Sequence, residues 1–456
     1  MAKMGPVSFK KRLVCLLFTI VSVPPAFAGR AEIPEKYFVL DNGLKIFLYE
    51  RHNVPLVHIV AAVNAGSKDE TDATSGLAHL LEHYILFRGT EVRSGSQVAQ
   101  DIRRHGGYFN AHTSQDLATF ELSLPAEYAE FGLRNQKEIL FDLKFGAAEV
   151  EAEKEVIFEE LGQIKDDPFR YASIRFYENL FKGHPYGRSV IGKAETIRAL
   201  TVEQLENFYR TRFVAGNCAL AVVGDFALKP IEEKVREVFG TVPKADVPAP
   251  HGSPPAAFSK IIEIQDELDV QEAYLVVGTS GPDYNNTDQY ACDILAEILG
   301  RGVNPLLYRP LKATRNLVNT ASMFYLTLKY SGAICVYLTL DPNRLAAAKN
   351  QLLQFLKQVR NENLARNDVA GEDVDLVFDY LAGAKNQILF DFQQAQESGL
   401  ALAESMAMHL LLREGETTPD YLGNIKKVTS SDVRKAAAKY LSRSDYVVVA
   451  IVPKKK

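Results

Sequence analysis

Cysteine is scarce in this chain, in which only four of 456 residues are Cys. Cys15 lies in an N-terminal segment that we expect to be removed, which leaves Cys218, Cys292 and Cys335. An odd number of thiols in an exported protein argues against a framework of disulfides. Cys218 and Cys335 lie in apolar, strand-like runs, so we predict packed free thiols.

Basic residues are too few to favour a nucleic-acid partner. The chain has 52 Lys and Arg against 57 Asp and Glu, a net charge of −5. Residues 1–28 carry four basic residues and no acid, so their removal would bring the net charge to −9. Nucleic-acid binding requires a basic face, and an acidic chain of this kind argues against it.

After the N-terminus, no apolar run is long enough to span a bilayer, which takes roughly 18 residues. The N-terminus has the pattern of a secretory signal peptide: basic Lys10–Arg12, apolar Leu13–Val23 and the cleavage sequence Ala26–Ala28. We therefore expect residues 1–28 to be a signal peptide and the mature chain to be exported, to the periplasm if the source is Gram-negative. No membrane span is expected.

Histidine is also scarce, with nine in the chain, yet two of them lie four residues apart in an apolar run. His79 and His83 would share one face of a helix, with Glu82 between them. Two imidazoles at this spacing suit zinc, and Glu82 is placed to accept a proton from a water that zinc activates. The order His-x-x-Glu-His is typical of the inverzincins. The alternative is an amphipathic helix that buries two histidines.

The chain is long enough for at least two domains. Five prolines in residues 242–255 indicate a linker, so we predict a zinc-binding domain over 32–241, a linker over 242–258 and a second domain over 259–456. The halves contain similar segments in the same order. Segments 201–205 and 219–223 match 429–433 and 447–451 at an offset of 228, and 118–124 matches 334–340 at an offset of 216. Strand-helix alternation in each half predicts two α+β domains that arose by duplication.

The second half should lack the metal site. Moving His79, Glu82 and His83 forward by 216 residues places them on Leu295, Ile298 and Leu299. This register predicts only apolar residues where the ligands would be. It therefore predicts one metal site per chain.

A zinc site with two histidines requires a further protein ligand and an open position for water. Candidates lie in the acidic segment Glu149–Leu161, although a charged helix is ordinarily a solvated face. Spacing alone does not choose among its carboxylates.

The chain resembles the pitrilysin/insulinase family of zinc metallopeptidases, and in particular its bacterial members similar to the mitochondrial processing peptidase beta subunit. The resemblance covers essentially all of the mature sequence. The segments that carry it are 40–44, 65–70, 76–90, 106–113, 153–160, 184–187 and 222–226.

The resemblance implies the fold and the roles of several residues. Each homologous α+β domain should be a mostly antiparallel sheet packed with helices, and the chain should form half of a clam-shell peptidase chamber. One Zn²⁺ per chain should be bound by His79, His83 and Glu160, with Glu159 the weaker candidate for the third ligand. Glu82 should be the general base, and Glu153 should support the site from behind the ligands. Asn110 and Ala111, on an edge strand, should bind the peptide substrate by backbone pairing.

One departure from the family concerns the second half. Members that act alone carry an Arg and a Tyr there that hold the substrate, and Leu306 and Asn319 stand in their places. We therefore expect a zinc-bearing subunit that works with a homologous partner carrying the Arg/Tyr pair, and a homodimer is the less favoured arrangement. The main alternative is a non-catalytic chamber subunit with a structural zinc, and a solute-binding module is a third.

Overall fold

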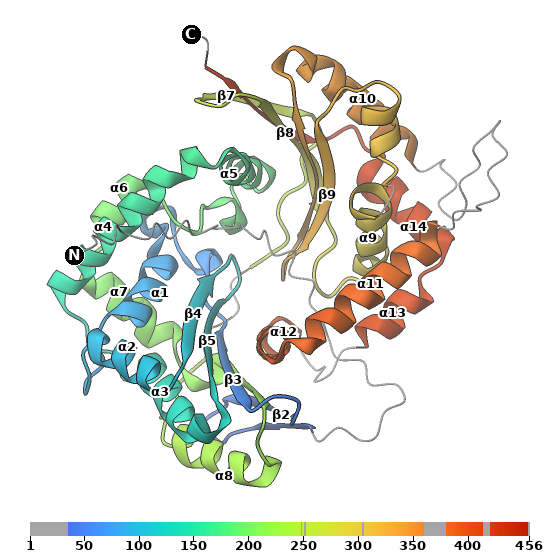
Figure 1. Cartoon of the computed structure of the whole chain (residues 1–456). Coiled ribbons are helices and arrows are strands. Elements are labelled where there is room, and N and C mark those ends of the chain that lie inside the picture. The colour runs from blue at the N-terminus through green and yellow to red at the C-terminus, as the bar shows by residue number, and fades with distance from the viewer. Residues whose placement is uncertain are drawn as a thin grey trace, which may run out of the picture.

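The computed structural model describes residues 35–247, 249, 252–302, 305–359, 380–413 and 420–454. Two mixed sheets, one in each half of the chain, are packed with helices (Figure 1). The predicted signal peptide lies outside the described residues, so its prediction stays open.

The first sheet has six strands in the order β1-β2-β6-β3-β5-β4. All neighbouring pairs are antiparallel except β2 and β6. Strand β4 lies at one edge, as the family resemblance implies. The strands are β1 Glu35–Val39, β2 Lys45–Glu50, β3 Leu56–Val63, β4 Tyr108–Thr113, β5 Ala118–Pro125 and β6 Cys218–Gly224.

The second sheet repeats the topology of the first, with no counterpart of β1 in the part of the chain that the structure describes. Its order is β7-β11-β8-β10-β9, and β7 and β11 form its single parallel pair. The same order and the same directions in both sheets confirm the prediction of two related α+β halves. The strands are β7 Ile262–Leu268, β8 Ala273–Gly281, β9 Thr320–Thr327, β10 Gly332–Leu340 and β11 Val447–Pro453.

Helices flank both sheets. Those of the first half are α1 Leu77–Phe87, α2 Gly95–Arg104, α3 Ala129–Phe141, α4 Ala147–Gln163, α5 Pro168–Leu180, α6 Ala194–Ala199, α7 Val202–Arg212 and α8 Leu228–Phe239. Those of the second half are α9 Asp288–Ala296, which continues as a π-helical turn Glu297–Arg301, α10 Leu345–Gln358, α11 Tyr380–Glu397, α12 Gly399–Leu412, α13 Tyr421–Lys427 and α14 Ser430–Ala436. Wider π-helical turns also span Arg309–Ala313 and Ala437–Leu441.

The burial of the strands follows from what covers each face. In β5, Phe120, Leu122 and Leu124 point into the helical core, and the residues between them face the opposite side of the sheet. Every residue of the central strand β6 is buried. A strand buried on all sides requires that both faces of the sheet be covered.

The second cover of each sheet is a helix from the other half of the chain. Helix α12 packs on β3 and β6, and helix α5 packs on β8 and β11 (Figure 1). Met406 and Leu410 join one apolar cluster with Val60, and Phe176 joins another with Val276 and Val449. Because the halves exchange helices, they form one body, and separating them would expose both clusters.

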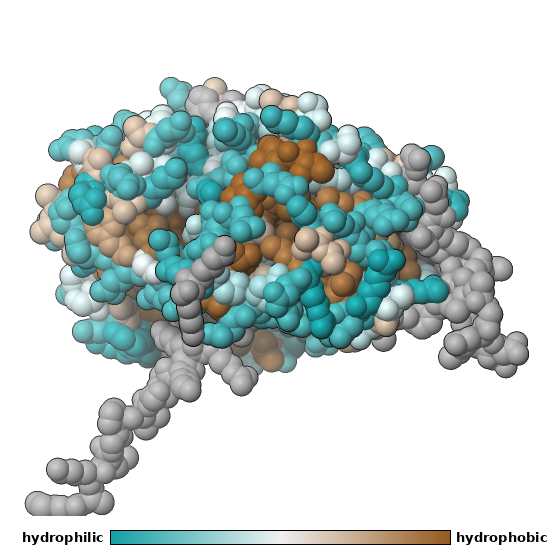
Figure 2. All heavy atoms as spheres, turned by 90° about the horizontal axis from the view of Figure 1, so that it is seen from above, coloured by the Kyte–Doolittle hydropathy of each residue, from teal (hydrophilic) through white to brown (hydrophobic). Residues whose placement is uncertain are grey.

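The three cysteines after the predicted signal peptide are free and buried, as predicted. Among the residues that the structure describes, no helix is long and apolar enough to cross a membrane. Figure 2 shows a face on which hydrophilic residues predominate and hydrophobic side chains surface in separate patches.

Candidate metal centre

Helix α1 begins at a glycine that no other residue replaces easily. Gly76 has a φ of +95°, and a Cβ there would lie 2.4 Å from Cδ1 of Ile197 and 2.9 Å from the Gly192 Cα. The carboxylate of Glu70 accepts hydrogen bonds from the backbone N–H groups of Gly76 (3.0 Å) and Ala78 (2.8 Å). These contacts satisfy free N–H groups at the start of the helix and fix its position.

We expect Gly76→Ala to lower the urea midpoint of unfolding. The left-handed conformation alone costs a residue with a Cβ about 1–2 kcal/mol, and the close contacts add to that cost. Gly162→Ala is the matched control, because nothing lies within 4 Å of a Cβ at that helical position. The control should be neutral or slightly stabilising. Equal midpoints for the two variants would show that Gly76 is not required.

Three side chains converge at the middle of α1. His79 and His83 point the same way, and Glu160 of α4 faces both of them. The carboxylate of Glu160 lies 3.8 Å from Nε2 of His79 and 3.6 Å from Nε2 of His83. One ligand atom from each residue lies within 4.8 Å of the other two. Among the described residues this is the single group of three His, Cys, Asp or Glu side chains so arranged.

A buried carboxylate supports His83 from the other side of the ring. Glu153 precedes Glu160 by two helical turns, so both face α1. Its side chain is 2% exposed, and Oε2 lies 3.4 Å from Nδ1 of His83. The guanidinium of Arg88, just after α1, lies 2.5 Å from the other oxygen. Glu153 therefore lies on the Nδ1 side of the imidazole, and Nε2 faces Glu160. Glu159 is exposed and belongs to no such group.

Burial sets the protonation of the two histidines in opposite directions. Burial lowers the pKa of His79 to about 3, helped by the charges of His83 and Arg170. Burial also acts to lower the pKa of His83, but the carboxylates of Glu153, Glu160 and Glu82 more than offset it and raise the pKa. The site thus combines a neutral imidazole with one that lies in a negative environment. Both features suit a cation.

Glu82 lines a cavity beside the histidines. The cavity has a volume of about 270 Å³ and is bounded by α1, the end of β4, helix α5 and residues 187–191. Burial raises the pKa of the Glu82 carboxyl above its ordinary value. A carboxylate whose pKa is raised toward neutrality is better matched to accepting and returning a proton. The geometry thus places a candidate base in the same cavity as His79.

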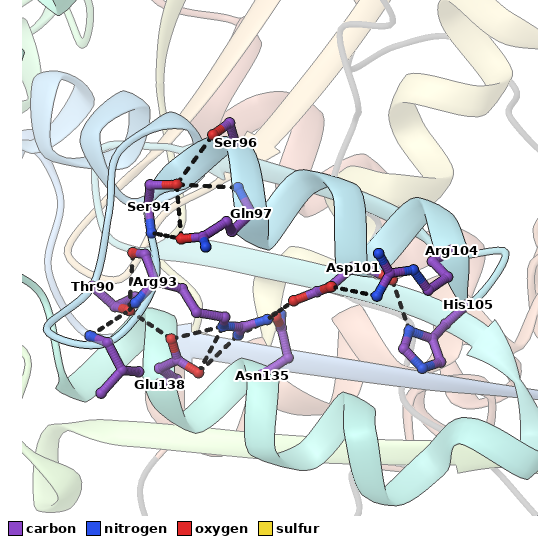
Figure 3. Close-up of polar contacts among 11 residues, drawn as sticks. Thr90, Arg93, Ser94, Ser96, Gln97, Asp101, Arg104, His105, Asn135 and Glu138 are labelled. Carbon is purple, nitrogen blue, oxygen red and sulfur yellow. Dashed lines mark hydrogen bonds and ion pairs between the residues drawn. The ribbon is translucent and has the colours of Figure 1, made fainter.

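A network around Arg93 anchors the chain just after α1 (Figure 3). The guanidinium of Arg93 donates to Glu138 of α3 at 2.8 Å and to Asp101 of α2 at 3.0 Å. It also donates to the Asn135 side chain at 3.0 Å, and the Thr90 hydroxyl donates to Glu138 at 2.5 Å. These contacts fix the end of the metal helix against two neighbouring helices.

The two predicted substrate-binding residues lie on the edge strand β4. Asn110 pairs with Glu121 of β5, and its amide nitrogen lies 3.0 Å from Nε2 of His112. The side chain of Ala111 is buried in the core, so only its backbone can meet a substrate. The unpaired edge of β4 offers backbone groups to an extended peptide. His112, which lines the cavity of Glu82, carries no signal in the sequence that marks it as a site residue.

The structure corrects the prediction of which residues in the second half correspond to the histidines of helix α1. The six core residues of α1 are 77, 78, 80, 81, 84 and 85. A shift of 214 residues places all six on core residues of the second half, namely 291, 292, 294, 295, 298 and 299. The shift of 216 from the strands is therefore wrong for this helix. At 214, His79 corresponds to Asp293, Glu82 to Ala296 and His83 to Glu297. The counterpart is acidic, and Leu295, Ile298 and Leu299 belong to the core.

A guanidinium occupies the acidic counterpart site. Nε of Arg301 lies 3.7 Å from Glu297, and another of its nitrogens lies 3.8 Å from Asp391 of α11. The Tyr421 hydroxyl donates to Asp293 at 3.0 Å. The second half thus has an ion-pair network where the first half has imidazoles.

Neither Leu306 nor Asn319 provides a cation or a phenol. Leu306 packs against the core of the second half, and the exposed Asn319 donates its amide to Glu272 at 2.8 Å. Arg170 of α5 does place a guanidinium in the cavity of Glu82. Arg170 could not be predicted from the sequence, because an arginine near the start of a helix carries no signal of its own.

Two family models match this chain. The model described as insulinase (peptidase family M16) matches residues 45–194, which include His79, Glu82, His83 and Glu160. The model described as the peptidase M16 inactive domain matches residues 199–371. Together they cover most of the chain.

Curated relatives are similar to the chain over most of its length. An "Uncharacterized zinc protease" from Rickettsia bellii is 24% identical, over 89% of this chain and 94% of the relative. A "Probable mitochondrial-processing peptidase subunit beta" from Arabidopsis thaliana is 24% identical, over 91% of this chain and 77% of the relative.

Solved structures share the fold. A protease from Helicobacter pylori superimposes with a TM-score of 0.82 at 22% identity, over 92% of this chain and all of that chain. A structure described as a peptidase M16 inactive domain, from Pseudomonas fluorescens, has a TM-score of 0.79 at 20% identity, over 93% of this chain and 99% of that chain. Family models, relatives and fold agree, and the chain belongs to the insulinase family, peptidase family M16.

Proposed function

We propose that the chain is a zinc-dependent endopeptidase that holds one Zn²⁺ through His79, His83 and Glu160. The observation that carries the proposal is the convergence of these three side chains within 4.8 Å. Two imidazoles and a carboxylate are a donor set that suits catalytic zinc, with a position left for water. The arrangement of Glu153 behind His83 is the kind of support that metal-binding histidines receive. The residues present therefore fit the metal.

Bound zinc would supply a Lewis acid that makes a water more acidic and polarises a peptide carbonyl. Glu82 accepts the proton of the attacking water and then returns it to the leaving amine. Glu153 holds the imidazole of His83 in place, and the carboxylate of Glu160 offsets the charge of the cation. The side chain of Glu82 is buried beside His79, which limits its contact with bulk water.

The substrate is a peptide or an unfolded segment that adds to the edge of β4. An extended chain would pair its backbone with residues 110–113 and so reach the cavity, whose wall includes His112 and Thr113. Substrates would meet the enzyme after export, in the periplasm if the source is Gram-negative.

The working assembly is a heterodimer in which this chain bears the zinc. The two halves exchange helices and form one body, and a second, homologous body would close the chamber. A homologous partner would supply the Arg and Tyr that Leu306 and Asn319 do not replace. A homodimer would close a chamber without supplying that pair.

The test of the zinc ligands compares two neighbouring carboxylates. Glu160→Gln should weaken zinc binding by at least about tenfold, because a ligand is lost. Glu159→Gln is the matched control and should bind zinc as the wild type does, because Glu159 is exposed. Zinc affinity is measured by competition with a chromogenic chelator. Weakened binding in Glu159→Gln alone would show that the third ligand is misassigned.

The alternative is a non-catalytic chamber subunit with a structural zinc. It is favoured by the similarity to a structure described as an inactive domain. In that case the protein would bind zinc but would not hydrolyse peptides, even with its partner present.

A further inference from the structure

The cavity beside the metal centre contains a guanidinium, that of Arg170, which has no partner among the residues that the structure describes. Arg170, Ile174 and Tyr177 line the cavity at helical spacing on one face of α5. The opposite face of α5, with Ala172 and Phe176, packs on the second sheet. Among the described residues, no carboxylate lies within ion-pair distance of Arg170 and no acceptor bonds its side chain. Arg170 thus points its charge into the cavity from a rigid helix.

The other charged side chains that line the cavity, Arg188 and Glu82, already have partners or a proposed role. Nε of Arg188 donates to Asp72 at 2.8 Å, and another of its nitrogens donates to the backbone oxygen of Glu70 at 2.7 Å. Glu82 is the one carboxylate among the described residues of the wall, and the proposed mechanism uses it as the base. Arg170 is only partly buried, so its guanidinium keeps its charge and would gain from an anion that enters the cavity. The cavity therefore favours an anionic group.

The size and position of the cavity indicate a substrate side chain. Its volume of about 270 Å³ lies just below the roughly 300–1,000 Å³ of sites for small-molecule ligands. It begins where β4 ends, so a peptide paired with β4 passes its mouth. The apolar walls at Ile174 and Ile191 suit the methylene groups of a long side chain.

We propose that this cavity is a subsite for a carboxylate of the peptide close to the scissile bond, and that Arg170 determines this preference. The carboxylate is either the side chain of Glu or Asp or the C-terminus of a short peptide. The inference rests on the proposed peptidase function. Arg170 is a specificity residue, and the metal and Glu82 perform the chemistry.

The test measures peptide binding without turnover. The probes are fluorescent peptides with Glu, Gln or Lys at each position around the cleavage site, as C-terminal acids and as amides. They are titrated against zinc-loaded full-length Glu82→Gln protein with its partner. We expect Glu to bind at least about tenfold more tightly than Lys at one position, as a hydrogen-bonded ion pair would give. A difference confined to acid against amide would assign the subsite to the C-terminus.

Reversing the charge of Arg170 then tests whether this residue determines the preference. Arg170→Glu in the same background should prefer Lys at that position, and Arg170→Gln should show no preference. Lys165→Glu is the matched control, since the same charge change falls on an exposed residue outside the cavity, and it should keep the preference for Glu. An unchanged preference in both Arg170 variants, with zinc content intact, would overturn the subsite. If the unmodified enzyme did not hydrolyse peptides but the preference for Glu in binding remained, the peptidase function would be overturned and the subsite would stand.

Discussion

Glu82→Gln should leave zinc bound and reduce peptide hydrolysis by about a hundredfold to ten-thousandfold. The substitution removes the group that accepts the proton of the attacking water, a role worth that range of rate in enzymes generally. The substitution keeps the size of the side chain and leaves the three proposed zinc ligands, His79, His83 and Glu160, unchanged. Zinc content by elemental analysis and cleavage of a quenched peptide, measured on one preparation, give the two readouts.

Glu155→Gln is the control for this substitution. It makes the same chemical change on an exposed residue of α4 and should retain both zinc and activity. Loss of zinc in Glu82→Gln would make Glu82 a ligand and not a base. Full activity in Glu82→Gln would remove it from the mechanism.

The isolated chain should bind zinc yet cleave peptides at least about a hundredfold more slowly than the complex with its partner. Stabilising the charge that develops on a peptide carbonyl contributes about this much to an enzyme's rate. Leu306 cannot donate a hydrogen bond from its side chain, and the amide of Asn319 is engaged with Glu272. The measurement is kcat/KM for one peptide, with and without the homologous subunit.

The control is substitution of the partner's Arg or of its Tyr. Each substitution should remove the increase in kcat/KM that the partner gives. A purified homodimer of this chain that matches the mixed complex would contradict the division of labour. In that case a group of this chain, such as the guanidinium of Arg170, would have to supply the missing charge.

The sequence predicts the metal centre well where the chemistry is local. His79 and His83 meet because four residues make about one turn of a helix, which spacing alone reveals. The third ligand is different, because several carboxylates of Glu149–Leu161 have similar spacing. The packing of α4 against α1 decides among them by turning Glu153 and Glu160 inward. The family resemblance gave the same choice, while periodicity did not.

Contacts between segments far apart in the chain could not be predicted from the sequence. The exchange of α5 and α12 between the halves leaves no local signal, because the apolar face of a helix does not specify which sheet it covers. It also decides that Arg170 faces the metal centre. The error in the counterpart of α1 has a similar cause. An offset taken from strands does not carry over to a helix between them when the connecting loops differ in length.

X-ray diffraction from zinc-soaked crystals on both sides of the zinc absorption edge tests the central claim most directly. The account predicts one anomalous peak per chain, in contact with Nε2 of His79, Nε2 of His83 and the carboxylate of Glu160. A chain without a peak there, or with its peak between Asp293, Glu297 and Asp391 of the second half, would contradict it.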